Sequence, residues 1–381
     1  MSLIELMVGL VIGLVLSLIM FKALLYAEGQ RRTTSAGNDA QQAGTLGSYG
    51  LQRSLRLGGS GFSGITAARG CMLNIFSGST TMVPLPSTLA APFDGLQGLS
   101  LPVSPVLIAN AGVDNDGTAT NPVSDALIVM AGTHASVNTW FQMTAAGATT
   151  KGMVINSMGL ATGDLLMAVD SGSGTKAGTC TVVQATSSID STSTHANYRQ
   201  STSSAGQQID IGSTYTSSNG LSGYTTDSQL ADLGASPIFQ IFAVANSSTG
   251  VPRLQSYDMF SGTTQDLNDD VVNLQAAYGL SATTDSGDTT VTSWQAPVGS
   301  YSLHSLRQGD AAAVAIINRI RAIRLSILTR SAIREKVAVQ ASPTIDMLAD
   351  LGANKVTITN TGTDLNYRYR LFDVTIPLRN H

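Results

Sequence analysis

The side chains that could do chemistry are few and scattered in this chain of 381 residues. Its four histidines lie far from one another, and none belongs to a cluster with metal-ligand spacing: His134, His195, His304 and His381. No Gly-x-Ser-x-Gly nucleophile motif stands in a strand–turn–helix setting. We therefore expect no catalytic residues, no cofactor and no enzymatic activity.

Two acidic turns carry oxygen ligands of the kind that Ca²⁺ prefers. Asp114 and Asp116 belong to a sequence that resembles half of a calcium loop, and Asp285 and Asp288 bracket a second glycine-containing turn. The first turn has no glutamate at the position of the twelfth ligand, which favours an ordinary aspartate turn. We keep these four aspartates as weak calcium candidates and expect no other metal site.

Gly59, Gly61 and Gly64 spell the Gly-x-Gly-x-x-Gly pattern of dinucleotide-binding loops. The pattern follows a predicted helix rather than a strand, and no βαβ unit with a ribose-binding acid comes after it, so we predict no dinucleotide site. The formal charge of -4 gives no reason to expect nucleic acid, because phosphate binding needs clustered lysine and arginine. Only 12% of residues are charged, against roughly 25% in ordinary soluble proteins, and this favours an extracellular, β-rich surface.

The two cysteines, Cys71 and Cys180, are too far apart in sequence for a Cys-x-x-Cys metal or redox motif. If the chain is exported, a disulfide between them would close a loop of about 110 residues and stabilise the fold by roughly 4 to 5 kcal/mol. The alternative is two buried thiols that do not pair.

The elements that could position any site begin with an apolar amino-terminal segment. Residues 6–21 contain no charge and no proline, and apolar residues continue to Tyr26 beyond Lys22. The segment can span a bilayer if Lys22 reaches the interface, with Tyr26 as the boundary aromatic. A signal peptide is the competing interpretation, but no basic region precedes the apolar run and no small-x-small cleavage site follows it.

Glu5 is the anomaly at the head of this apolar run, because burying an unpaired carboxylate costs several kcal/mol. In a staggered bundle of helices, the amino group of a neighbouring Met1 could pair with it. Alternatively, Glu5 sits among lipid headgroups. The residues alone leave both readings open.

The first sixteen residues, MSLIELMVGLVIGLVL, resemble the mature start of type IV pilins and type II secretion pseudopilins. The resemblance implies cleavage by a prepilin peptidase, N-methylation of Met1 and subunit assembly through Glu5 and Met1, so we expect the numbering to begin at the mature terminus. It also implies that the apolar helix forms the core of a filament, through Leu6, Val8, Leu10, Ile12, Leu14, Leu16, Ile19 and Phe21.

The rest of the chain predicts an α+β fold in which a long helix packs against a β-rich globular domain. Residues 1–57 form the helix: 1–26 lie in the membrane or filament core, and 27–57 form an amphipathic half that five glycines weaken, so that local breaks are expected.

The globular domain covers 58–381. It includes a serine- and threonine-rich stretch, about 171–232, that we interpret as a surface excursion or loosely ordered insertion. Strands are predicted at 106–108, 126–130, 165–169 and 238–243.

Residues 316–330 and 367–380 resemble the carboxyl-terminal part of PilW-family minor pilins. Shorter segments resemble the same family in the same order along the chain: 51–58, 124–129, 163–169 and 271–279. The resemblance implies work with other minor pilins at the start of pilus assembly, in a complex that primes the filament and carries a tip adhesin.

The leading hypothesis is a PilW-like minor pilin of the type IV pilus. It would pass once through the bacterial inner membrane before assembly and become part of an extracellular pilus, or fimbrium, afterwards. Its partners would be other pilins and minor pilins, contacted through the amino-terminal helix. The alternatives are the main repeating subunit, which would be a homo-oligomer, a pilus-displayed module for cell adhesion that uses 171–232, and a type II secretion pseudopilin.

Overall fold

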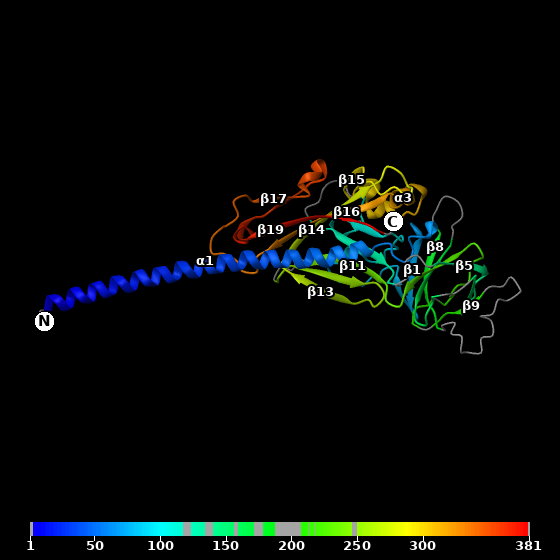
Figure 1. The fold of residues 1–381 in the computed structure, drawn as a ribbon, viewed down its shortest axis with the longest axis horizontal. Helices are drawn as coiled ribbons and strands as arrows, with labels where there is room; N and C mark the ends of the chain where they lie inside the picture. Colours follow the sequence, from blue (N-terminus) through cyan, green and yellow to red (C-terminus); the bar gives the residue numbers. More distant parts are fainter. Residues whose placement is uncertain are drawn as a thin grey trace.

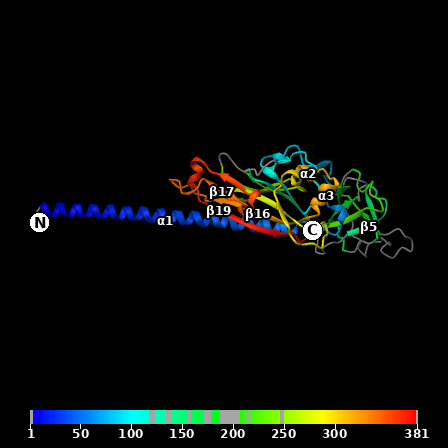
Figure 2. The ribbon, with the colours of Figure 1, turned by 90° about the horizontal axis from the view of Figure 1, so that it is seen from above.

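The computed structural model describes residues 3–116, 123–133, 140–155, 159–170, 178–186, 207–212, 214–216, 218–245 and 250–379. It consists of one long helix, α1 (Leu3–Leu57), and a large β-rich domain, which confirms the predicted α+β class. The first half of α1 projects away from the domain in two perpendicular views, and the second half lies along it (Figures 1 and 2). At about 1.5 Å per residue, the helix is roughly 80 Å long.

Within the described residues the domain has four sheets. The largest has the order β2 (Thr80–Val83), β1 (Met72–Ser77), β8 (Thr179–Gln184), β7 (Leu165–Val169), β10 (Gln229–Gly234), β5 (Trp140–Ala145), β6 (Lys151–Val154) and β9 (Gln207–Asp210). The five-stranded sheet has the order β13 (Thr264–Asp269), β12 (Arg253–Asp258), β11 (Ile238–Ala245), β4 (Ala126–Ala131) and β3 (Val106–Ala109). Neighbouring strands are antiparallel in both, except for the parallel pair β1 and β8.

The sheet closest to α1 has the order β15 (Ser293–Gln295), β14 (Val271–Leu280), β16 (Ile320–Arg330) and β19 (Tyr369–Pro377). A hairpin of β17 (Thr344–Met347) and β18 (Val356–Thr359) flanks it. Two short helices, α2 (Leu303–Leu306) and α3 (Ala311–Ile317), precede β16, and 3-10 helices lie at Thr66–Ala68, Asp94–Leu96, Asn110–Gly112, Gly299–Tyr301, Ala349–Asn354 and Gly362–Asn366. Asp310 caps α3, because its carboxylate accepts a hydrogen bond from the Ala313 backbone N–H at 2.8 Å.

Ser124 and Asp125 join the five-stranded sheet to the sheet beside α1. The Asp125 backbone N–H donates to the carbonyl of Leu274 in β14 at 2.8 Å. Its buried carboxylate accepts hydrogen bonds from the backbone N–H groups of Ala276, at 3.0 Å, and Ala111, at 3.1 Å. Burial raises the pKa of Asp125 to about 7, against the opposing effect of these two donors. The segments 124–129 and 271–279, far apart in sequence, are therefore adjacent in space.

Two expectations were wrong, one about the stretch 171–232 and one about α1. The stretch 171–232 is not simply a surface excursion, because it supplies β8, β9 and β10 to the largest sheet. A short strand needs only a few apolar side chains on its buried face, and Val183, Ile209 and Leu230 provide them in one core cluster. Residues 171–177 and 187–206 of this stretch lie outside the described residues. The helix α1 is also continuous through its glycines, without the expected breaks.

Candidate assembly interface

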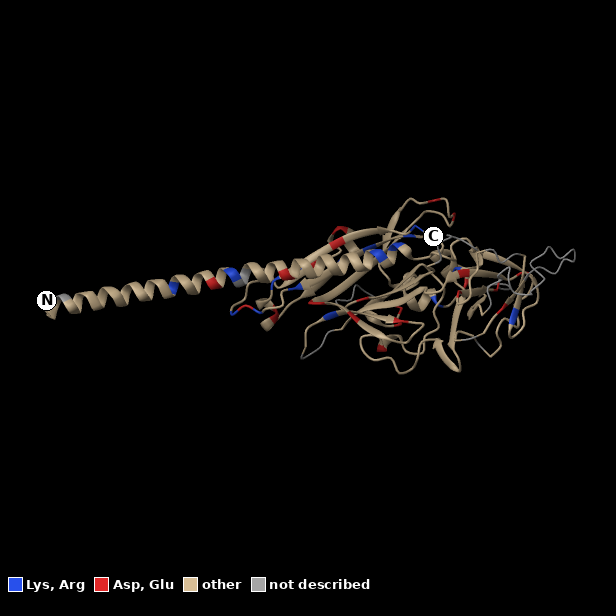
Figure 3. Ribbon diagram, turned by 60° about the horizontal axis from the view of Figure 1, so that its bottom comes forward, with Lys and Arg blue, Asp and Glu red and all other residues tan. Residues whose placement is uncertain are grey.

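The amino-terminal half of α1 is an exposed apolar surface. All eight predicted filament-core residues, Leu6, Val8, Leu10, Ile12, Leu14, Leu16, Ile19 and Phe21, have more than half of their surface exposed. In the described part of the chain, α1 is the one helix long and apolar enough to cross a membrane. Figure 3 shows almost no charge along this half. A helix that is apolar on every side must be covered by lipid or by other helices.

The predicted assembly pair falls at the edge of what the structure describes. Met1 lies outside the described residues. The backbone of Glu5 belongs to the first turns of α1, but its side chain also lies outside the described part. The pairing of Glu5 with a neighbouring Met1 therefore stays a prediction.

A stripe of small residues fixes the second half of α1 to the domain. Ala36, Ala40, Gly44 and Gly47 are buried at spacings of three or four residues, so they share one face of the helix. Leu51 and Leu55, further along, enter the main core cluster. A Cβ at Gly44 would lie 1.8 Å from the ring of Phe372 in β19, so only glycine fits here without rearrangement.

Because these side chains are small, polar groups of the sheets reach the helix backbone. The Thr329 hydroxyl in β16 donates to the carbonyl of Ala40 at 2.9 Å, and the Asn268 amide in β13 donates to the carbonyl of Ala43. Sequence reasoning treated the glycines as helix breakers and missed this stripe. Their recurrence every three or four residues beside two alanines was the signal available.

The outer face of the same half of α1 remains uncovered. Leu46 is 59% exposed and Tyr49 is 67% exposed, and Arg53 and Arg56 are exposed beyond them. The helix therefore offers two kinds of contact: a wholly apolar surface near the amino terminus and a mixed aromatic and cationic surface along the domain.

The disulfide expected between Cys71 and Cys180 is present, with a Cα–Cα distance of 5.7 Å. Both residues are fully buried. Cys180 lies in β8 and Cys71 directly precedes β1, so the bond fastens the one parallel strand pair found among the described residues. This outcome excludes the alternative of two unpaired thiols.

The strands beside α1 are also where a comparison with known proteins succeeds. Residues 241–380 match the family model of PilW, the Type IV Pilus-assembly protein W. The match runs from β11 to the end of β19 and so includes β14, β16 and β19, which pack against α1. No curated protein and no solved structure matches the chain. The match supports a relationship to type IV pilus assembly for this part of the domain, and residues 1–240 lie outside it.

The second calcium candidate lies within the PilW-matching segment, and a guanidinium occupies its turn. Arg321, only 2% exposed, donates from Nη2 to the carbonyl of Asp285 at 2.6 Å and from Nε to the carbonyl of Asp288. The Asp288 carboxylate accepts hydrogen bonds from Thr290 and Thr283, which lower its pKa. The turn is thus organised by a protein cation and gives no support to a calcium site.

The first calcium candidate is also in contact with an arginine, here through a carboxylate. The Asp114 carboxylate lies 2.7 Å from Arg307 and 3.6 Å from the imidazole of His304. Asp116 accepts a hydrogen bond through its backbone carbonyl from Gly299. Among the described residues no three His, Cys, Asp or Glu side chains gather as a metal site. His134, His195 and His381 lie outside those residues.

The glycine pattern at 59–64 has a packing role. Gly59 and Gly61 both have a φ of 85°, a conformation that favours glycine. A Cβ at Gly61 would lie 3.0 Å from the carbonyl of Asp232, so the turn after α1 packs closely on β10. This arrangement places Gly61 in contact with protein backbone.

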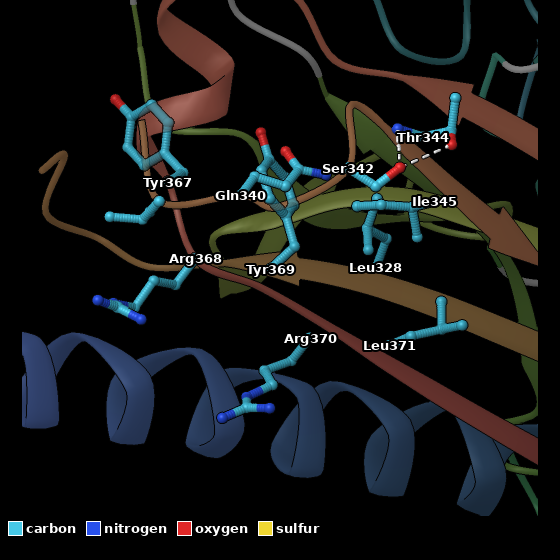
Figure 4. Close-up of a pocket in the computed structure, with 11 residues that line it drawn as sticks. Leu328, Gln340, Ser342, Thr344, Ile345, Tyr367, Arg368, Tyr369, Arg370 and Leu371 are labelled. Carbon is cyan, nitrogen blue, oxygen red and sulfur yellow. Dashed lines mark hydrogen bonds between the residues drawn. The ribbon is translucent and has the colours of Figure 1, made fainter. Parts of the chain in front are cut away.

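A cavity of about 380 Å³ opens beside β19 within the PilW-matching segment (Figure 4). Gln340, Ser342 and Thr344 line it on one side of the strand, and Arg370 extends from the strand toward α1. Arg368 of the lining is 3.4 Å from the carboxylate of Glu335. Among the described residues that line it there is no carboxylate, histidine or cysteine.

Proposed function

We propose that this chain is a structural subunit of a type IV pilus, of the PilW-like minor pilin kind, with no enzymatic activity. The observation that carries the proposal is the exposed apolar half of α1, joined rigidly to a domain whose residues 241–380 match PilW. No described residue of the chain covers this part of the helix, and its surface needs lipid first and other helices afterwards.

Before assembly, the apolar half of α1 spans the inner membrane once, and the domain stands outside it. During assembly the helix leaves the lipid and packs among the helices of other pilins, and Glu5 pairs with the amino group of a neighbouring Met1. Each apolar side chain that is fully buried contributes roughly 1.5 to 3 kcal/mol relative to water, which makes extraction into a helix bundle feasible where extraction into water is not. The subunit acts with other minor pilins to prime the filament, in a complex that carries a tip adhesin.

The small-residue stripe supports this role mechanically. Thr329 and Asn268 hold the helix backbone itself, so a pull on the amino-terminal half is transmitted directly to β16 and β13. A subunit in a filament under tension needs such a connection between its helix and its domain.

Replacing Glu5 with alanine tests the assembly role. We expect Glu5→Ala to insert into the inner membrane normally and to enter sheared filaments at a small fraction of the wild-type level. The reason is that the variant leaves the amino group of the neighbouring Met1 without a charge partner. Glu28→Ala is the matched control, since Glu28 is an exposed carboxylate on the same helix beyond the apolar run. Quantitative immunoblotting of membranes and filaments gives both values. Wild-type incorporation of Glu5→Ala would refute the pairing.

A further inference from the structure

The largest sheet lies at the end of the domain remote from the amino terminus (Figure 1), and a polar cavity opens beside its strands β1 and β8. Its volume is about 550 Å³, within the roughly 300 to 1,000 Å³ of small-molecule sites. Strand alternation creates it: Leu73 and Ile75 of β1 point into the core, whereas Asn74 and Phe76 line the cavity. Thr181 of β8 lies directly across from Asn74.

The cover of the cavity is a turn formed by residues 218–224, and it is held in place by backbone contacts. Leu221 donates its N–H to a carbonyl of the segment before β6 at 3.0 Å, and Gly147 donates to the carbonyl of Tyr224 at 2.9 Å. Gly220 has a φ of 53°, and a Cβ there would lie 2.0 Å from a backbone oxygen of that segment. The cavity is therefore preformed, which lowers the entropy cost of binding.

Below the cavity, the disulfide fixes the spacing of its floor. Cys180 lies between Thr179 and Thr181, both of which line the cavity, and it joins β8 to β1 through Cys71. The Tyr224 hydroxyl donates to the Thr181 hydroxyl at 2.8 Å and so ties the cover to the floor.

The polar groups in the cavity are available to a ligand. Within the described part of the chain, the side chains of Asn74, Asp170 and Asn219 have no hydrogen-bond partner, although each lines the cavity. The half-buried ring of Phe76 adds an apolar surface. Among the described residues of the lining there is no lysine or arginine, and Asp170 is the one charged side chain, which disfavours an anionic ligand.

We propose that this cavity binds a neutral oligosaccharide. A sugar presents many hydroxyl groups that both donate and accept hydrogen bonds, which suits two amides, a carboxylate and several hydroxyls. Its apolar C–H face can lie against Phe76. A purely apolar ligand would leave these polar groups unpaired, and a phosphate or acidic sugar would be repelled by Asp170. The proposal goes beyond assembly and does not depend on it.

Saturation-transfer NMR on the full-length protein tests it, in a zwitterionic detergent without a sugar headgroup. The probes are maltose, lactose and diacetylchitobiose, with sialyllactose as the acidic comparison. We expect saturation transfer to at least one neutral disaccharide and a Kd at least tenfold higher in both Asn74→Ala and Asp170→Asn. Asp227→Asn, an exposed carboxylate of the following turn that does not line the cavity, is the matched control and should bind like wild type.

The proposal is overturned if none of the three neutral disaccharides binds, if sialyllactose binds as tightly, or if the Asn74 and Asp170 variants bind like wild type. Asn219→Ala, in the exposed part of the cover, is a further variant should either of these fail to fold. The cavity variants should enter filaments at the wild-type level, and Glu5→Ala should bind the sugar normally. Failure of sugar binding is thus separable from failure of assembly.

Discussion

Adding one methyl group at Gly44 tests how α1 is fixed to the domain. Gly44 lies on the buried stripe of α1, and its missing Cβ would be 1.8, 2.2 and 2.4 Å from three ring atoms of Phe372. In Gly44→Ala the ring of Phe372 must retreat by about 1.6 Å to reach ordinary van der Waals contact. The ring packs against the main core cluster, so its retreat disturbs those contacts.

The expected magnitude follows from two opposing effects. Overpacking a well-packed site costs about 1 to 3 kcal/mol, and the large displacement places this site near the upper value. Alanine in place of a helical glycine returns about 1 kcal/mol of helix propensity. We therefore expect Gly44→Ala to lower the free energy of unfolding by roughly 2 kcal/mol.

Gly50→Ala is the matched control, because Gly50 lies on the same helix and a Cβ there would meet nothing within 4 Å. It should gain roughly 1 kcal/mol from helix propensity alone. Urea unfolding of the full-length protein in detergent, followed by tryptophan fluorescence, should rank Gly50→Ala above wild type and wild type above Gly44→Ala. Equal or greater stability of Gly44→Ala would refute the close packing of Phe372 on the helix.

Two further predictions concern the domain. Burial raises the pKa of Asp125 from 3.8 to about 7, so the stability it contributes is full below about pH 4 and is lost as the pH rises through about 7. From pH 5 to pH 8, the unfolding free energy of wild type should fall by up to roughly 3 kcal/mol relative to that of Asp125→Asn. A difference between the two proteins that stays constant with pH would contradict the raised pKa. Replacing Cys71 and Cys180 together with alanine should cost roughly 4 to 5 kcal/mol, because the disulfide closes a long loop. Dithiothreitol should destabilise wild type and leave the double variant unchanged; equal sensitivity of both would count against the bond as the cause.

Sequence patterns predicted the elements whose side chains are consistent over a whole segment. The apolar run to Tyr26 predicted a helix for the membrane or filament core, and the structure has a helix there. Short apolar runs predicted β3, β4, β7 and β11 to within two residues at either end. Strands β8, β9 and β10 were missed, because serine and threonine dominate 171–232 and the few apolar residues are informative only once their partner strands are known.

By itself, the sequence predicted the apolar amino-terminal helix and the α+β class, because these follow from residue types and from spacing along the chain. It offered a Cys71–Cys180 disulfide as one of two alternatives, and the structure decided between them. Only the tertiary structure decided what Gly44, Asp125 and Asn74 do. Gly44 meets a strand more than three hundred residues later, Asp125 joins two sheets, and Asn74 faces a cavity because β1 pairs with β8. Such contacts depend on which distant strands lie side by side, and no local periodicity encodes that choice.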